Sequence, residues 1–311
     1  ASVALISTAT PNLAYFYGIY ALLGVTAAIP SSVMYTKVIA GWFDSNRGFA
    51  LGFAGGVGNG VGAAITPIIA AALLVSYGWR GAHVGLALII VAIGLPTLLL
   101  LLRDPPLKRS AAIEDVDGIT LAEARKTSTF WIILAAVALG AGCMTAIFSR
   151  VIPILLDRGF AQHDAVSVLV TFSVTTAAWQ FCVGYVFDRL PKPWVAAPFY
   201  LAAIVGLFLL ATSDDQAVLL LSAVLMGLGL GTEYGVLPYF LSRYFGIRHY
   251  GAISGMIYGI VVLTQGVTPV LMDIDFDQNG DYQLAIVVIS VAMLAAAFLM
   301  TRLPTLPRIR T

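Results

Sequence analysis

Charge is scarce in this chain of 311 residues, because charged side chains make up 11% of it and hydrophobic residues 59%. An ordinary soluble domain carries roughly 25% charged residues. So few charged groups cannot cover the surface of a water-soluble fold of this length. The composition therefore excludes a soluble globular protein.

Cysteine and histidine are also rare, with two and three copies. Cys143 and Cys182 both fall inside long apolar runs, so we expect packing rather than a disulfide framework. No Gly-Lys-Ser/Thr follows the glycine-rich run 52–62, which argues against a phosphate loop. The aspartates of 273–281 resemble the start of a calcium loop, but Gln278 stands where that loop needs glycine. We expect no metal, no cofactor and no nucleic-acid partner.

Long runs almost free of charge dominate what the chain does contain. Each is close to the ~20 residues that a bilayer-spanning helix needs, whereas strands of a membrane barrel would be ~10-residue alternating segments. The runs predict an all-α polytopic membrane protein. They occupy residues 16–41, 49–76, 82–102, 130–153, 165–187, 194–212, 217–242, 250–272 and 284–301.

Basic residues gather in every second loop between these runs, which hold 13 of the 17 lysines and arginines. The alternate loops hold aspartates instead. Because cytoplasmic loops carry an excess of Lys and Arg, the pattern predicts a protein of the plasma (inner) membrane with its C-terminus in the cytoplasm.

Two segments of the chain repeat each other. GWFDSNRGFALG, residues 41–52, and RYFGIRHYGAISG, residues 243–255, align so that Arg47 lies beside Arg248. Both would be cytoplasmic turns, and prolines and glycines around them align at a nearly constant offset. Parallel repeats of this kind are typical of transporters built from two bundles around a central pathway. Counting back from the second half predicts that the first spans precede Ala1.

The segment GYVFDRLPK, residues 184–192, resembles the G-x-x-x-D-R-x-x-R/K signature of the major facilitator superfamily, carried here by Gly184, Asp188, Arg189 and Lys192. GITLAEARKTSTFW and VIPILLDRGF resemble its monocarboxylate-transporter-like branch, which includes oxalate:formate exchangers. This branch reads the substrate carboxylate with an arginine four residues before the motif glycine, where this chain has Gln180. The charged hairpin can lock neighbouring helices in one state, or it only marks topology.

The resemblance implies a major facilitator fold of two six-helix bundles, the first truncated, with nine full spans plus a stub. Residues 1–102 would be the remainder of the N-terminal bundle, 103–128 a central cytoplasmic loop with a linker role, and 129–311 the C-terminal bundle. It also implies a monomeric carrier that exposes one midplane site alternately to each side.

Glu233 is the acid that we expect deepest in the membrane. It lies ten residues before Arg243, hence about 15 Å from the cytoplasmic boundary. An ionised carboxylate there is costly, so Glu233 should face the pathway, find a partner or stay protonated. It is either a proton carrier or a structural acid between helices.

Arg150 lies seven residues before Asp157, about 10 Å below the outer boundary. It either draws an anion into the cavity or snorkels outward or pairs with Asp157. Four further side chains in apolar spans can orient a small substrate or simply pack: Trp179, Gln180, Tyr234 and Tyr258.

The leading hypothesis is a secondary active transporter for a small organic anion such as a monocarboxylate, coupled to a proton or a counter-anion, in contact with membrane lipid. The alternative is an exporter of a neutral or cationic small molecule, because Gln180 replaces the carboxylate reader. A sensor that kept the carrier fold also stays open. The segment Gly-Ala-Ile-Ser-Gly, residues 251–255, faintly resembles the nucleophile segment of a membrane serine protease. Such an enzyme needs a base within reach of the serine, and no histidine follows Ser254. We therefore do not expect an enzyme.

Overall fold

The computed structural model describes residues 2–27, 60–101, 118–190, 192–246 and 248–306, with single positions between 35 and 58. Within these ranges the chain is helical, and β pairing is limited to an isolated bridge between Gly118 and Gly246. Seven helices of this part are long and apolar enough to cross a membrane. The predicted all-α membrane class is confirmed.

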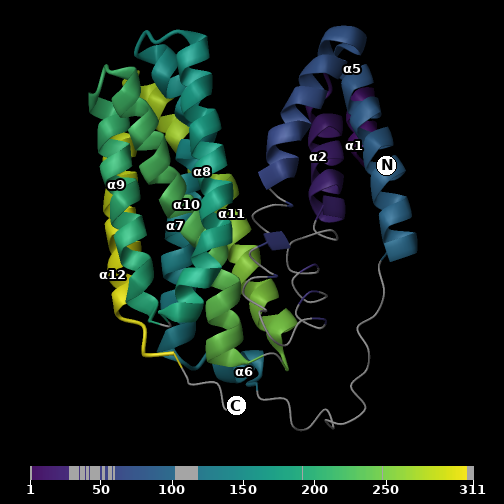
Figure 1. The fold of residues 1–311 in the computed structure, drawn as a ribbon. Helices are drawn as coiled ribbons and strands as arrows, with labels where there is room; N and C mark the ends of the chain where they lie inside the picture. The colour runs from purple at the N-terminus through teal and green to yellow at the C-terminus, as the bar shows by residue number, and fades with distance from the viewer. Residues whose placement is uncertain are drawn as a thin grey trace. The chain divides into compact units, whose positions relative to one another are not determined.

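The helices divide into two units, which are described separately (Figure 1). The first holds α1 (Ser2–Leu5), η1 (Ile6–Thr8), α2 (Leu13–Ala27) and α5 (Gly60–Leu101). Gly78 breaks α5 with φ 66° and ψ 178°, a conformation that glycine adopts without a Cβ penalty. The break separates two arms that correspond to the predicted spans 49–76 and 82–102. Most of 28–59 lies outside the described residues.

Arg80 follows this break and ties α5 to η1. Its Nε donates to the carbonyl of Ser7 at 3.0 Å, and its Nη2 donates to the carbonyl of Ala9 at 3.3 Å. The guanidinium carbon lies 4.3 Å from the centre of the Trp79 ring. The last carbonyl groups of a helix have no hydrogen-bond partner within the helix, so a cation that donates to them is stabilising.

The second unit is a bundle whose helices run side by side in Figure 1. Within it, α10 packs against α8 and α9, while α7 packs against α11 and α12. Large side chains such as Phe130, Phe172 and Phe240 are fully buried between the helices. The elements are α6 (Leu121–Ala124), α7 (Ser128–Asp157), α8 (Gln162–Arg189), η4 (Pro193–Ala196), α9 (Ala197–Thr212), α10 (Gln216–Phe245), α11 (Tyr250–Asn279) and α12 (Gln283–Thr301).

Short connections make consecutive helices of this bundle antiparallel, so most of the basic residues gather at one end and most of the acidic residues at the other. We call the basic end the one with Arg125, Lys126, Arg189, Lys192, Arg243, Arg248 and Arg302, and the acidic end the one with Asp157, Asp164, Asp214, Asp215, Asp277 and Asp281. Several helices outrun the predicted spans. The span predicted at 250–272 continues as α11 to Asn279, which places Asp273, Asp275 and Asp277 on the helix rather than in a loop.

Helices α8 and α10 approach each other closely through glycines of α10. A Cβ on Gly231 would lie 2.7 Å from the carbonyl oxygen of Thr176 and 3.0 Å from the amide nitrogen of Gln180. A Cβ on Gly227 would lie 2.6 Å from Cβ of Thr175. Small residues at this spacing let two helix backbones meet.

The end of the predicted loop 103–128 is ordered. Thr120 and Glu123 form a capping box at the start of α6, with the Thr120 amide donating to Glu123 Oε2 at 2.7 Å. The Ile119 amide donates to the carbonyl of Phe245 at 3.1 Å. Residues 118–127 therefore dock on the turn between α10 and α11, whereas the sequence predicted only a linker.

Candidate functional site

Glu233 lies inside the second unit, on the stretch of α10 that faces α7 and α9. Its side chain is 2% exposed, and the Tyr200 hydroxyl of α9 donates a hydrogen bond to Oε2. Gly140 of α7 leaves room for this pair, because a Cβ there would meet Oε2 and would lie 2.7 Å from the Tyr200 ring. Three helices thus enclose the carboxyl group.

The second carboxyl oxygen, Oε1, is buried and has no hydrogen-bond partner in the described structure. Nor does a basic side chain of the described residues form an ion pair with Glu233. Burying an unpaired charge is costly. The site therefore suits a neutral carboxyl group better than a carboxylate.

Trp179 and Thr232 form the next layer of the same site. The Trp179 indole N–H of α8 donates to Thr232 Oγ1 at 2.8 Å, and the indole packs on Phe199 with ring centres 4.7 Å apart. Thr232 and Phe199 immediately precede Glu233 and Tyr200 in the chain. The residues that contact Trp179 therefore lie next to the Glu233–Tyr200 pair along α9 and α10.

The other predicted pathway residues form no hydrogen bond with this pair in the part of the chain that the structure describes. Gln180 is half-buried beside Gly231 on the α8–α10 contact. Tyr234 follows Glu233 and is 37% exposed, while Tyr258 is half-buried and packs against the core from α11. Their roles toward a substrate stay predictions.

Arg150 forms a bidentate ion pair with Asp273. Its Nε and Nη2 donate to the two carboxylate oxygens, which joins α7 to α11, and the side chains are 29% and 40% exposed. The sequence offered Asp157 as the partner, but Asp157 is two turns away along α7. Asp273 replaces it because α11 extends beyond the predicted span.

The predicted hairpin motif lies at the basic end. Gly184 and Arg189 belong to the last turns of α8, and the Arg189 guanidinium carbon lies 4.6 Å from the centre of the Tyr185 ring. Lys192 is exposed in the connection to η4. The side chain of Asp188, and Arg47 as a whole, lie outside the described residues.

Arg248 lies beside the docked segment 118–127 in the turn between α10 and α11. A Cβ on Gly118 would lie 2.8 Å from the Arg248 Cβ. The turn begins with Gly246 at φ 76°. The second copy of the repeated turn thus contacts the end of the predicted loop 103–128.

Sequence reasoning missed Tyr200, Thr232, Gly140 and the pairing of Asp273. Tyr200 could have been found from the sequence, because it is a hydroxyl-bearing residue in the otherwise apolar run 194–212. Nothing in the sequence distinguished Gly140.

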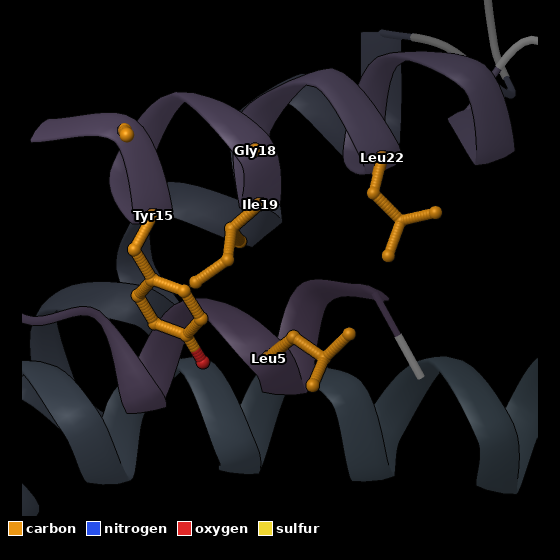
Figure 2. A pocket seen from close by; sticks show the side chains of 6 residues that line it. Leu5, Tyr15, Gly18, Ile19 and Leu22 are labelled. Atoms are coloured by element: carbon orange, nitrogen blue, oxygen red, sulfur yellow. The ribbon is translucent and has the colours of Figure 1, made fainter.

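A separate hollow of about 410 Å³ lies in the first unit, between α1 and α2. Figure 2 shows its apolar side chains and the Tyr15 hydroxyl, which hydrogen-bonds with Thr8 at 2.9 Å. Its lining is Leu5, Ala14, Tyr15, Gly18, Ile19 and Leu22. It contains no ionisable side chain that would bind an organic anion.

Comparisons with known proteins agree with this architecture. Among solved structures, the chain resembles a variant of the E. coli fucose:proton symporter FucP, with a TM-score of 0.73, 16% identity, and coverage of 98% of this chain and 81% of that one. A second structure, of the major facilitator superfamily transporter FucP in the outward conformation, gives a TM-score of 0.68, 18% identity, and coverage of 98% and 80%. No curated protein matches.

At such identities these likenesses establish the fold. The family follows from a profile of the sequence, which matches residues 1–269 under the description Major Facilitator Superfamily. The chain is therefore a member of the Major Facilitator Superfamily, a family of transporters.

Proposed function

We propose that the protein is a secondary active transporter that moves a small organic anion, such as a monocarboxylate, by alternating access and in company with a proton. The observation that carries the proposal is Glu233, a buried carboxyl group with one oxygen hydrogen-bonded to Tyr200 and the other unpaired. A group that is neutral when enclosed and charged when water reaches it can bind and release a proton as the surroundings change.

Arg150 is the proposed anion-binding group. Asp273 satisfies its guanidinium in this conformation, and a substrate carboxylate has the same planar geometry as the aspartate. Because both side chains are partly exposed, a substrate carboxylate can reach the guanidinium and compete with Asp273 for it. The monocarboxylate-transporter-like branch stays a resemblance, and Gln180 in place of the branch's arginine makes Arg150 the better candidate.

The proton-coupling prediction concerns Glu233→Gln in the full-length protein in vesicles. Glutamine resembles the protonated carboxyl group and cannot release a proton. We expect loss of accumulation driven by a pH gradient, with exchange of labelled for unlabelled substrate retained. Uptake of labelled lactate, oxalate and formate measures both. Unchanged pH-driven accumulation would remove proton coupling from the proposal.

The anion-binding prediction concerns Arg150→Gln and Asp273→Asn. Removing a charge-assisted hydrogen bond costs about 1.5–3 kcal/mol, so Arg150→Gln should raise KM for the anion about 10-fold or more. Asp273→Asn frees the guanidinium and should lower KM. A rise in KM for both variants would indicate that the pair is structural only.

The second candidate is export of a neutral or cationic compound. The observation that favours it is the neutralisation of Arg150 by Asp273, which leaves the acid Glu233 as the unmatched group. FucP, named as a fucose:proton symporter, shows that this fold serves neutral sugars. Competition by cationic compounds, but not by carboxylates, in the same vesicles would select this candidate.

A further inference from the structure

The outer surfaces of α9 and α12 are apolar along their length. The two helices contact each other, and both expose large hydrophobic side chains at helical spacing. On α9 these are Leu201, Val205 and Phe208, and on α12 they are Leu284, Val287, Val288, Val291, Leu294 and Phe298. A face of this kind on a membrane-spanning helix contacts lipid acyl chains.

At the basic end this face finishes in two exposed aromatic rings and two cations. Trp194 of η4 is 52% exposed and Phe298 of α12 is 55% exposed. The Arg302 guanidinium carbon lies 4.6 Å from the centre of the Phe298 ring, and Lys192 is exposed just before η4. Because η4 contacts α12, we treat these four residues as one surface, the basic-end patch.

The chemistry of the basic-end patch matches one type of ligand. A guanidinium stacked on a ring keeps its N–H edge free for a phosphate group, and tryptophan favours the headgroup level of a bilayer. The patch itself contains two cations and no acid. A soluble anion would use the charges and leave the apolar face unused.

We propose that the basic-end patch binds a membrane phospholipid of net negative charge. Arg302 and Lys192 hold its headgroup phosphate, Trp194 and Phe298 flank the glycerol region, and the acyl chains lie along α9 and α12. The basic-end patch is an exposed cationic surface, whereas Glu233 is buried within the bundle. The proposed lipid site does not depend on the identity of the transported substrate.

The test uses the full-length protein in vesicles of mixed phosphatidylglycerol and phosphatidylcholine, with bromine on the acyl chains of one lipid at a time. Bromine quenches nearby tryptophan fluorescence, and the part of the signal that disappears in Trp194→Phe reports the patch. We expect stronger quenching of Trp194 by brominated phosphatidylglycerol than by brominated phosphatidylcholine at equal mole fraction. Equal quenching by the two lipids overturns the proposal.

Charge removal provides the matched comparison. The double variant Lys192→Gln with Arg302→Gln should lower the preference for phosphatidylglycerol by roughly 5-fold for each basic residue removed. Arg125→Gln with Lys126→Gln removes the same charge at the same end, outside the patch, and should leave the preference unchanged. An equal fall in both double variants would indicate diffuse surface charge and overturn the site.

Three further measurements separate a lipid site from other causes. Inorganic phosphate in the buffer should not reduce the quenching, and full competition by phosphate would show that the patch binds a soluble anion instead. Arg302→Lys keeps the charge but loses the planar stacked group, so it should retain part of the preference. Thermal unfolding of each variant in detergent checks that the bundle is intact.

Discussion

A carboxyl group inside a helical bundle needs a hydrogen-bond partner, and Glu233 finds it in Tyr200. Counting residues from Arg243 along a helix predicts a deep position for Glu233, and the structure buries its side chain inside the second unit. Its partner was not predictable, because the direction that Glu233 faces depends on the rotation of α10 against α7 and α9. The same limit applies to Arg150, whose partner lies 123 residues away in the chain.

The glycine at position 140 is predicted to be essential for this pair. A methyl group at Gly140 would meet the Glu233 carboxyl group and the Tyr200 ring, and overpacking typically costs about 1–3 kcal/mol. We expect Gly140→Ala to lower the thermal unfolding temperature in detergent. Gly266→Ala on α11 is the control, since nothing lies within 4 Å of a Cβ there. Equal stability of the two variants would contradict the tight fit.

Glu123 offers a prediction about pH at the basic end. The backbone N–H and then the hydroxyl of Thr120 donate to its carboxylate and lower its pKa from the ordinary value of 4.5. A carboxyl group with a lowered folded-state pKa stabilises its helix above pH 4.5, and this stabilisation disappears as the pH falls through the lower folded value. Acidification below pH 4.5 should therefore weaken the capping box that begins α6.

This titration is directly measurable, because the chain contains only three glutamates, Glu114, Glu123 and Glu233. Carboxyl ¹³C labelling of glutamate, with assignment by single Gln variants, should give Glu123 a midpoint below 4.5. Thr120→Val removes the hydroxyl donor and should shift the midpoint upward. A midpoint at 4.5 in the unaltered protein would show that the capping box does not form.

At the scale of elements, the apolar runs predicted the helices of the second unit within a few residues at most ends. The main difference is α11, where Asp273, Asp275 and Asp277 were assigned to a loop because of their charge. In the structure Asp275 accepts hydrogen bonds from Asn279 at 2.7 Å and from the Ala285 amide at 3.0 Å. Local partners at a helix end therefore allow charged residues to continue the helix.

The docking of residues 118–127 leads to a prediction about protease access. A Cβ on Gly118 would lie 2.9 Å from the Arg248 amide nitrogen and 3.3 Å from the Phe245 carbonyl oxygen. Since backbone atoms cannot move aside cheaply, Gly118→Ala should detach α6 and speed trypsin cleavage after Arg125 and Lys126 by about 10-fold, for a cost near 1.4 kcal/mol.

The matched control for that experiment is Gly251→Ala. It lies just past the same turn with nothing within 4 Å of an added Cβ, so cleavage should stay at the rate of the unaltered protein. Protection of Arg125 in both variants would mean that the docked segment is held by other contacts.

At the scale of the whole molecule, the alternation of charge between loops predicts that the basic end faces the cytoplasm. Single cysteines test this after Cys143 and Cys182 are replaced by serine. We expect Gln278→Cys, at the acidic end, to react with a membrane-impermeant maleimide added outside intact cells, and Thr305→Cys to react only after permeabilisation. The reverse pattern would invert the topology.

The family was predictable from GYVFDRLPK and the repeated aromatic-basic turns, and the profile match over residues 1–269 confirms it. Composition sufficed for the fold class because so many apolar residues require a membrane. The identity of the substrate could not be predicted in the same way. Substrate recognition depends on a few side chains whose directions are set by helix packing, as Gln180 beside Gly231 illustrates.

The glycine contact between α8 and α10 has a mechanical consequence. With backbone against backbone at Gly227 and Gly231, and the Tyr239 hydroxyl bound to the carbonyl of Phe187 at 2.9 Å, neither helix can slide without the other. We therefore expect α8 and α10 to move together as one rigid element. A tilt of this pair would move the end of α8, with Gly184 and Arg189, together with Glu233 of α10. Under the proposed function, the movement of this end of α8 would therefore be linked to the exposure of Glu233 to water.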